Sequence, residues 1–266
     1  MKRLNSNQNL ATIIIVHGAF EHAGRYRSLA ESFQKAGYNV IYGDLPGQGL
    51  AEGKKGHIKK FETYIDTVRQ WLQQADSSRP VFLLGHSMGG TVVMRVMQEL
   101  KPSVNGVILS SPAAGILNGA SKSLEAVTYV LNKVWPSVLV KAPFKPEYVT
   151  RNPEIIAKDK QDSLIIEKVS IRWYKEFRKA IKKSFSEVEE FPDVPLLVMQ
   201  AGEDYMVDPE KTKEWFHKVG CKEKTYKEWP GFYHEIFNEP EQEYVYNFAL
   251  NFIHFQVKQA GKEESL

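Results

Sequence analysis

The 266-residue chain contains one cysteine and no long apolar run. Its single cysteine, Cys221, cannot form an internal disulfide, which favours a reducing compartment. The first apolar run, residues 12–16, is too short for the core of a signal peptide or for a membrane-spanning helix. These two features together predict a cytoplasmic protein.

Signals for metal and nucleic-acid binding are also missing from the sequence. The seven histidines are scattered, and neither a C-x-x-C nor an H-x-x-x-H pair occurs, so we expect no metal and no cofactor. The formal net charge is only +3, without a concentrated basic and aromatic patch, which argues against a nucleic-acid partner. The sequence gives no indication of the oligomeric state.

Short apolar runs rich in β-branched residues alternate with amphipathic helical patterns along most of the chain. Because such alternation is typical of βαβ units, it predicts an α/β fold with a mostly parallel central sheet flanked by helices. The predicted strands are residues 12–16, 39–42, 81–84, 106–109, 196–200 and 225–229. About ten residues precede the first strand, which leaves little room for an N-terminal hairpin, so we expect a shortened sheet edge.

The alternation stops between residues 113 and 190, where a helical pattern is interrupted by prolines. We interpret residues 113–190 as an inserted helical cap, and residues 1–112 with 191–266 as the core. The cap carries 14 lysines and arginines against 10 aspartates and glutamates, so it holds the basic excess of the chain. Two apolar stripes at helical spacing run through it: Leu124, Val127, Leu131, Val134 and Val138, then Ile166, Val169, Trp173 and Phe177.

A candidate nucleophile lies in the sequence Gly85-His86-Ser87-Met88-Gly89, between a predicted strand and a helical pattern. A sharp strand-to-helix turn would hold Ser87 above the sheet edge, and crowding at this turn requires glycine at the flanking positions. A serine hydroxyl also needs a histidine to take its proton and a carboxylate to orient that histidine. The motif therefore predicts a serine hydrolase.

The base is expected after the nucleophile, since α/β-hydrolases with this turn place serine, acid and histidine in that order. His217 and His254 lie within helical patterns. His234 instead follows a strand and a turn, beyond a strand's carboxyl end, where parallel sheets keep their sites. We expect His234 to be the general base.

Three carboxylates after the strand that ends at Gln200 compete for the role of the acid: Glu203, Asp204 and Asp208. Asp208 precedes Pro209 and a helical pattern, which is typical of a helix N-cap. Asp204 is favoured over Glu203 because its side chain is shorter and stiffer. The predicted triad is thus Ser87, Asp204 and His234.

An oxyanion formed during ester cleavage needs two backbone N–H donors that are already in place. One donor is expected from Met88, the residue after the nucleophile. The other is expected from Ala19, in the loop that follows the strand ending at His17-Gly18.

The stretch from His17 to Tyr26 has the pattern H-G-x-x-E-H-x-G-R-Y, and together with Gly85–Gly90, Gly43–Gly49 and Tyr233-His234-Glu235 it resembles a known family. It is similar to monoacylglycerol lipases and bacterial lysophospholipases, α/β-hydrolases of the serine aminopeptidase S33 type, above all to phospholipase-like members from bacilli. The resemblance implies the α/β-hydrolase fold, a lid over an acyl pocket, and the triad and oxyanion donors named above. This stretch also contains four polar residues that either contact a substrate headgroup or, as we favour, hold the loop that carries Ala19 in place: Glu21, His22, Arg25 and Tyr26.

The expected activity is hydrolysis of single-chain acyl lipids, monoacylglycerols or lysophospholipids, through an acyl-enzyme. The alternatives are acyl transfer, cleavage of small soluble esters or peptides, and a non-catalytic ligand-binding role. We expect Leu131, Trp173 and Tyr233 to contact the substrate. The basic excess of the cap also predicts peripheral contact with anionic membrane surfaces, with Lys141 and Lys145 taking part.

Overall fold

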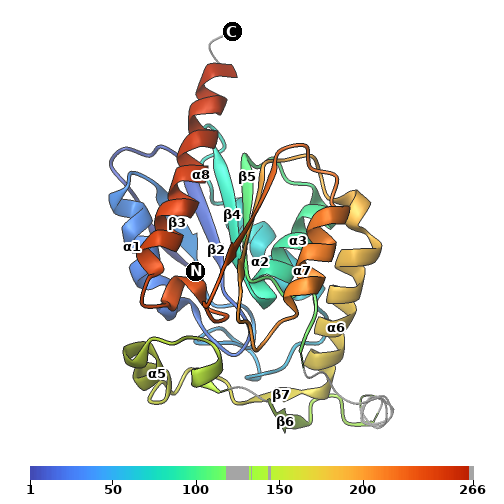
Figure 1. Ribbon diagram of the computed structural model, residues 1–266. Helices are drawn as coiled ribbons and strands as arrows, with labels where there is room; N and C mark the ends of the chain where they lie inside the picture. The colour runs from blue at the N-terminus through green and yellow to red at the C-terminus, as the bar shows by residue number, and fades with distance from the viewer. Residues whose placement is uncertain (118–131, 133, 143–144, 264–266) are drawn as a thin grey trace.

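A seven-stranded sheet in the order β1-β3-β2-β4-β5-β8-β9 forms the centre of the computed structural model, which describes residues 1–117, 132, 134–142 and 145–263 (Figure 1). Its strands are β1 (Lys2–Leu4), β2 (Thr12–Val16), β3 (Asn39–Tyr42), β4 (Val81–His86), β5 (Gly106–Ser110), β8 (Leu196–Ala201) and β9 (Lys224–Trp229). All neighbouring strands pair in parallel except β1, which is antiparallel to β3. The predicted α/β fold and each of its six predicted strands are therefore confirmed.

The N-terminal edge of the sheet is short. Strand β1 has three residues, with Lys2 opposite Tyr42 and Leu4 opposite Val40. This antiparallel strand forms the edge next to β3, and the expected shortened edge is confirmed. Short edge strands also limit pairing with other chains.

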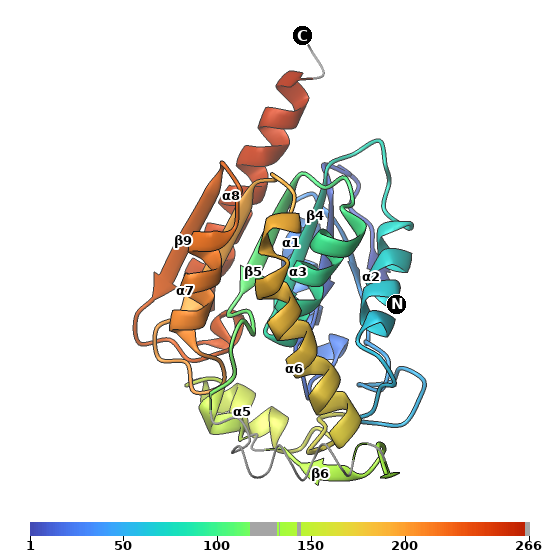
Figure 2. The same cartoon turned by 90° about the vertical axis from the view of Figure 1, so that its right-hand side faces the viewer.

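Helices cover both faces of the sheet (Figures 1 and 2). Helices α1 (Arg27–Lys35) and α8 (Gln242–Glu263) lie on one face, and α2 (Glu62–Leu72), α3 (Met88–Leu100), α6 (Ile171–Ser186) and α7 (Pro209–Lys218) lie on the other. Successive residues of β2 point to opposite faces, so Ile13 packs with the α1 and α8 side chains and Ile14 packs with those of α2 and α3. Burial on both faces explains why β2 is apolar at nearly every position.

The chain between β5 and β8 lies mostly beyond the carboxyl ends of the parallel strands, where α5, β6 and β7 are seen in Figure 1. It contains β6 (Leu139–Lys141), a 3₁₀ helix η2 (Pro146–Tyr148), α5 (Pro153–Asp159), β7 (Lys168–Ser170), α6 and a 3₁₀ helix η3 (Val188–Glu190). Helix α6 packs beside α3 on the sheet, where the side-chain amide of Gln98 donates to the carbonyl of Ser184 at 2.8 Å.

The two predicted apolar stripes of this region are only partly helical. Strands β6 and β7 pair antiparallel with Val140 opposite Val169, so the helical interpretation of Val169 is wrong, and Val138 lies in the chain just before β6. A short β-branched run fits a strand as well as a helix, and periodicity alone does not separate the two. Trp173 and Phe177 do lie on α6, whereas Leu124, Val127 and Leu131 fall outside the described residues.

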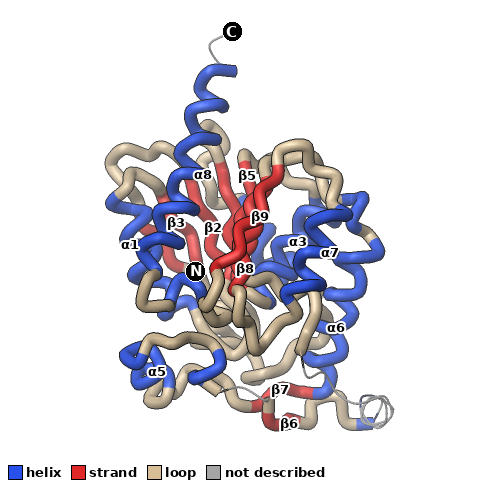
Figure 3. Tube along the Cα trace, in the orientation of Figure 1, coloured by secondary structure: helices blue, strands red, loops and turns tan. Residues whose placement is uncertain are grey.

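Loops gather between the carboxyl ends of the strands and the layer that contains α5 and β7 (Figure 3). Two further 3₁₀ helices, η1 (Ala23–Tyr26) and η4 (Ile236–Asn238), lie in the loops that follow β2 and β9. Parallel sheets bind their ligands at this edge, and the candidate site is found there.

Candidate catalytic site

Ser87 occupies the sharp turn between β4 and α3. Its backbone has φ 52° and ψ −120°, a conformation that side-chain-bearing residues rarely adopt and that costs about 1–3 kcal/mol. A Cβ atom on Gly85 would lie 2.5 Å from the carbonyl oxygen of Gly89, and one on Gly89 would lie 2.1 Å from the carbonyl oxygen of Val16. Only glycine fits at both flanking positions, as the sequence motif predicts.

His234 and Asp204 are brought together across the ends of β8 and β9. The distance from His234 Nδ1 to Asp204 Oδ2 is 2.8 Å, and both side chains are buried. The backbone amides of Met206 and Val207 donate to Asp204 Oδ1 at 2.8 and 2.9 Å. The carboxylate is therefore fixed from both sides.

Gln200, at the end of β8, is a contact of this carboxylate that the sequence interpretation did not include. Its Nε2 donates to Asp204 Oδ2 at 3.1 Å, the same oxygen that faces His234, and the side chain is fully buried. The available signal in the sequence was a polar residue at the end of an apolar strand, and this signal alone does not predict which group the residue contacts.

The other candidates for acid and base lie elsewhere. Asp208 caps α7, where its carboxylate accepts from the amides of Glu210 and Lys211 at 3.0 and 3.3 Å. His217 is part of α7, and His254 is part of α8. Among the competing carboxylates that the structure describes, Asp204 is the one hydrogen-bonded to His234.

The environment of His234 sets its protonation. Burial opposes a charge on the ring, but the Asp204 carboxylate outweighs this through its charge and its hydrogen bond, and with Glu235 and Glu21 it raises the pKa of His234 above 6.5. Because Asp204 accepts only from a protonated Nδ1, the neutral ring leaves the lone pair on Nε2 free to take a proton. The neighbouring ring of His86 is 4.8 Å away, centroid to centroid, and burial together with the charge of His234 lowers its pKa to about 4.

The amides expected to hold an oxyanion flank Ser87. Within the part of the chain that the structure describes, neither the Ala19 nor the Met88 N–H donates to another protein group. The loop that carries Ala19 packs against Ser87, since a Cβ atom on Gly18 would lie 3.1 Å from the Cβ of Ser87. Two N–H groups near Ser87 thus have no protein acceptor within the described part of the chain.

His17 fastens the start of this oxyanion loop (residues 17–21). Its Nε2 accepts from the Leu45 amide at 2.9 Å, so Nδ1 carries the proton that it donates to the carbonyl of Gly18 at 2.8 Å. Burial lowers the pKa of His17, which keeps the ring neutral in this arrangement.

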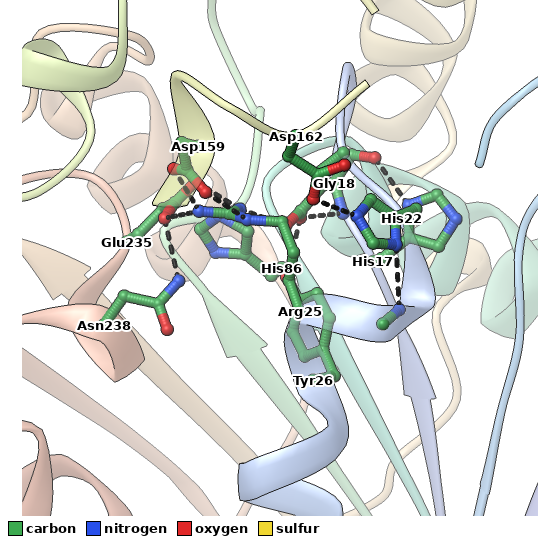
Figure 4. Close-up of polar contacts among 12 residues, drawn as sticks. His17, Gly18, His22, Arg25, Tyr26, His86, Asp159, Asp162, Glu235 and Asn238 are labelled. Carbon is green, nitrogen blue, oxygen red and sulfur yellow. Dashed lines mark hydrogen bonds and ion pairs between the residues drawn. The ribbon is translucent and has the colours of Figure 1, made fainter. Parts of the chain in front are cut away.

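A buried ionic network stands behind the oxyanion loop (Figure 4). Glu21 Oε1 accepts from the Gly18 amide at 2.5 Å and from the Tyr26 hydroxyl at 2.7 Å, and Glu21 Oε2 is 2.6 Å from Arg25 Nη1. Arg25 also contacts Asp159 and Glu235, and the sequence interpretation gave neither carboxylate a role beside Arg25. These contacts support the bracing role, rather than headgroup contact, for this stretch of the chain.

Residues 145–170, which we call the roof segment, are attached to the core by main-chain hydrogen bonds. The Glu235 amide donates to the carbonyl of Val149 at 2.7 Å, and the Ile166 amide donates to the carbonyl of Phe20 at 2.8 Å. A third bond runs from the Ser170 amide to the carbonyl of Gly56 at 2.7 Å. The roof segment thus touches both the oxyanion loop and the loop that carries His234.

The predicted substrate contacts have different surroundings. Trp173 is 2% exposed; its Nε1 donates to the Tyr64 hydroxyl at 2.9 Å, and its ring packs against Phe20 and Phe177 at centroid distances of 5.6 and 5.2 Å. Tyr233 is partly buried and stacks edge-on against Tyr205. Leu131 lies outside the described residues.

Comparison with known proteins decides the family. The family model described as "Serine aminopeptidase, S33" matches residues 7–241 of the chain. The chain belongs to this family of hydrolases. This hydrolase is 45% identical over 249 residues to phospholipase YtpA of Bacillus subtilis, covering 93% of the chain and 96% of that relative.

Two further proteins show how widely this likeness extends. The hydrolase is 30% identical over 244 residues to a monoacylglycerol lipase of Mycolicibacterium smegmatis, with 91% of the chain and 87% of the relative covered. The crystal structure of Paleococcus ferrophilus monoacylglycerol lipase superposes with a TM-score of 0.86 at 27% identity, covering 97% of this chain and 98% of that one. The predicted α/β-hydrolase fold and family membership are confirmed.

Proposed function

We propose that this hydrolase cleaves the carboxylic ester bond of single-chain acyl lipids, with Ser87 as nucleophile, His234 as general base and Asp204 as the acid that orients the base. The observation that carries the proposal is the Asp204–His234 hydrogen bond, together with the strained turn at Ser87, whose preceding residue His86 has its ring 4.8 Å from that of His234. The names of the relatives, phospholipase and monoacylglycerol lipase, support the substrate class.

The proposed reaction uses only protein groups and water. Ser87 Oγ bonds to the acyl carbon while His234 Nε2 takes the hydroxyl proton, and the Ala19 and Met88 amides stabilise the oxyanion. Collapse of this intermediate breaks the ester bond, and His234 returns the proton to the departing alcohol. Water, deprotonated by His234, then attacks the acyl-enzyme, and a fatty acid leaves while Ser87 regains its proton.

A cluster of aromatic side chains beside the oxyanion loop is consistent with binding of an acyl chain. Phe20 belongs to this loop and packs against Trp173, which packs in turn against Phe177. We propose that Trp173 helps to line the acyl site and that Tyr233, next to the base, contacts the alcohol side of the ester. Leu131, the third residue predicted to contact the substrate, lies outside the described part of the chain.

A hydrolysis panel tests the substrate class. Acyl chains of increasing length are combined with glycerol, glycerophosphocholine and p-nitrophenol as leaving groups, and initial rates are measured. We expect kcat/KM to rise with chain length for single-chain glycerol or glycerophosphocholine esters, because an apolar site gains about 0.8 kcal/mol for each buried methylene. Activity confined to short esters, or to aminoacyl amides, would contradict the proposal.

We also propose that the chain around β6 contacts anionic lipid surfaces. Of the helices that the structure describes, none has the length and apolar character of a transmembrane span. Trp135 is 64% exposed and Val140 is 43% exposed, and the exposed Lys141 and Lys145 follow closely. Exposed apolar side chains next to lysines suit a negatively charged interface.

Vesicle sedimentation tests this contact. Charge reversal at Lys141 and Lys145 should weaken binding to phosphatidylglycerol vesicles by about 1 kcal/mol for each lysine removed, while hydrolysis of a short soluble ester is unchanged. The matched control reverses Lys213 and Lys222, two exposed lysines of the core, and should bind as the wild type does. Equal binding by both double variants, or none by the wild type, would refute the membrane role.

A further inference from the structure

Arg25 uses every one of its donors on buried carboxylates. Its Nη1 donates to Glu21 at 2.6 Å and to Glu235 at 2.8 Å, and its Nη2 donates to Glu235 and Asp159, both at 2.7 Å. Its Nε donates to Asp159 at 3.1 Å. A guanidinium has five N–H groups, so this set leaves none free.

The three carboxylates belong to separate segments of the chain that meet at Arg25. Glu21 holds the Gly18 amide and so belongs to the oxyanion loop, while Glu235 directly follows His234. Asp159 ends α5 in the roof segment. All four side chains are at most 7% exposed, so solvent screens these ion pairs little.

We propose that Arg25 is a positioning residue: through Glu21 and Glu235 it holds the oxyanion loop and the His234 loop in one fixed relation to Ser87. This inference rests on the proposed roles of the Ala19 amide and His234. It assigns to one side chain the alignment of two groups that act in the same step: the amide donor, which meets the carbonyl oxygen of the ester, and the base, which takes the proton of the attacking Ser87 hydroxyl. A displacement of about 1 Å in such groups costs up to about 10²-fold in rate.

The network also places charge beside the base. The titratable and charged groups around His234 and Arg25 are Asp204, Glu235, Glu21, Asp159 and His86. Glu235 and Glu21 raise the pKa of His234, whereas the cation of Arg25 balances those carboxylates. Removing the cation should therefore move the His234 pKa up, and removing the Glu235 carboxylate should move it down.

The test compares two variants, each of which breaks the Arg25–Glu235 ion pair but which should shift the pH dependence of activity in opposite directions. The pH dependence of kcat/KM on a soluble p-nitrophenyl ester is measured for Arg25→Gln and Glu235→Gln. We expect kcat to fall 10- to 100-fold in Arg25→Gln, on the order allowed by misalignment, with little change in KM. The lower pH limb of activity should move up in Arg25→Gln and down in Glu235→Gln.

Arg25→Lys separates charge from geometry. Lysine keeps the cation but has three donors for five acceptor contacts, so the pH limb should stay near that of the wild type while kcat remains low. The matched control is Arg95→Gln on α3, because Arg95 is 1% exposed and pairs with Glu187 at 2.6 Å away from these loops. It should lose thermal stability without a change in kcat or in the pH limb.

A surface cavity of about 220 Å³ bordered by Arg25, His86 and Glu235 allows chemical rescue. Millimolar methylguanidinium should restore part of the kcat of Arg25→Ala, and equal sodium chloride should not. The inference would be overturned if the Arg25 variants, like Arg95→Gln, kept the kcat and the pH limb of the wild type. It would also be overturned if the pH limb moved in the same direction in Arg25→Gln and Glu235→Gln. If the wild type itself hydrolyses no ester, it is the proposed function that fails.

Discussion

Ser87→Ala is expected to abolish ester hydrolysis, with kcat reduced on the order of 10⁶-fold, while the protein stays folded. The substitution removes the proposed nucleophile from a turn at the sheet edge and opens no cavity in the apolar core. Turnover of a p-nitrophenyl ester, fluorophosphonate labelling and the melting temperature are measured together. A variant that keeps its activity would contradict the assignment, as would one that unfolds.

Ser87→Gly provides a companion measurement based on the backbone of the turn. Glycine adopts positive φ at little steric cost, so removing the side chain should relieve about 1 kcal/mol or more of the strain held at Ser87. We expect Ser87→Gly to be as inactive as Ser87→Ala but to have a higher melting temperature than Ser87→Ala. An unchanged or lower melting temperature would argue against stored strain at this position.

Asp204→Asn is expected to lower kcat on the order of 10⁴-fold, and His234→Ala should be about as damaging as loss of the nucleophile. The carboxylate accepts from His234 Nδ1–H at 2.8 Å and so selects the tautomer that leaves Nε2 basic. An amide at position 204 stabilises the other tautomer, in which Nε2 holds the proton. Single-turnover acylation of a p-nitrophenyl ester measures the loss directly.

Asp208→Asn is the matched control, because it makes the same substitution four residues away. Asp208 caps α7, and asparagine is about as good a cap as aspartate, so both kcat and stability should stay close to wild type. If Asp208→Asn lowers kcat more than Asp204→Asn does, the assignment of the acid is wrong.

The sheet could be predicted because its signals are local. Buried parallel strands such as β2 are continuous apolar runs, and the turn at Ser87 needs glycines at fixed positions that its own neighbours require. The N-cap pattern at Asp208 was equally local, and recognising it left Glu203 and Asp204, of which the shorter side chain of Asp204 was favoured as the partner of His234. The site edge then follows, because parallel sheets bind ligands at the carboxyl ends of their strands.

The rest depends on contacts between distant segments. Arg25 meets Glu235 across 210 positions and Asp159 across 134, and nothing near either carboxylate in the sequence names an arginine as its partner. Similarly, the pairing of β6 with β7 joins two three-residue strands, each too short to show a strand period. Burial and pairing of this kind are decided by the folded core rather than by the segment itself.

The main-chain attachment of the roof segment has a consequence for engineering substrate range. Its main-chain bonds to Phe20, Glu235 and Gly56 do not involve roof side chains, so a library that randomises roof side chains would keep these three bonds. Proline is the exception at Ile166 and Ser170, whose N–H groups are donors. Variation of the roof can therefore be wide, provided that the roof side chains bonded to the core are held constant: Thr150, Arg151, Asp159, Asp162 and Ser170.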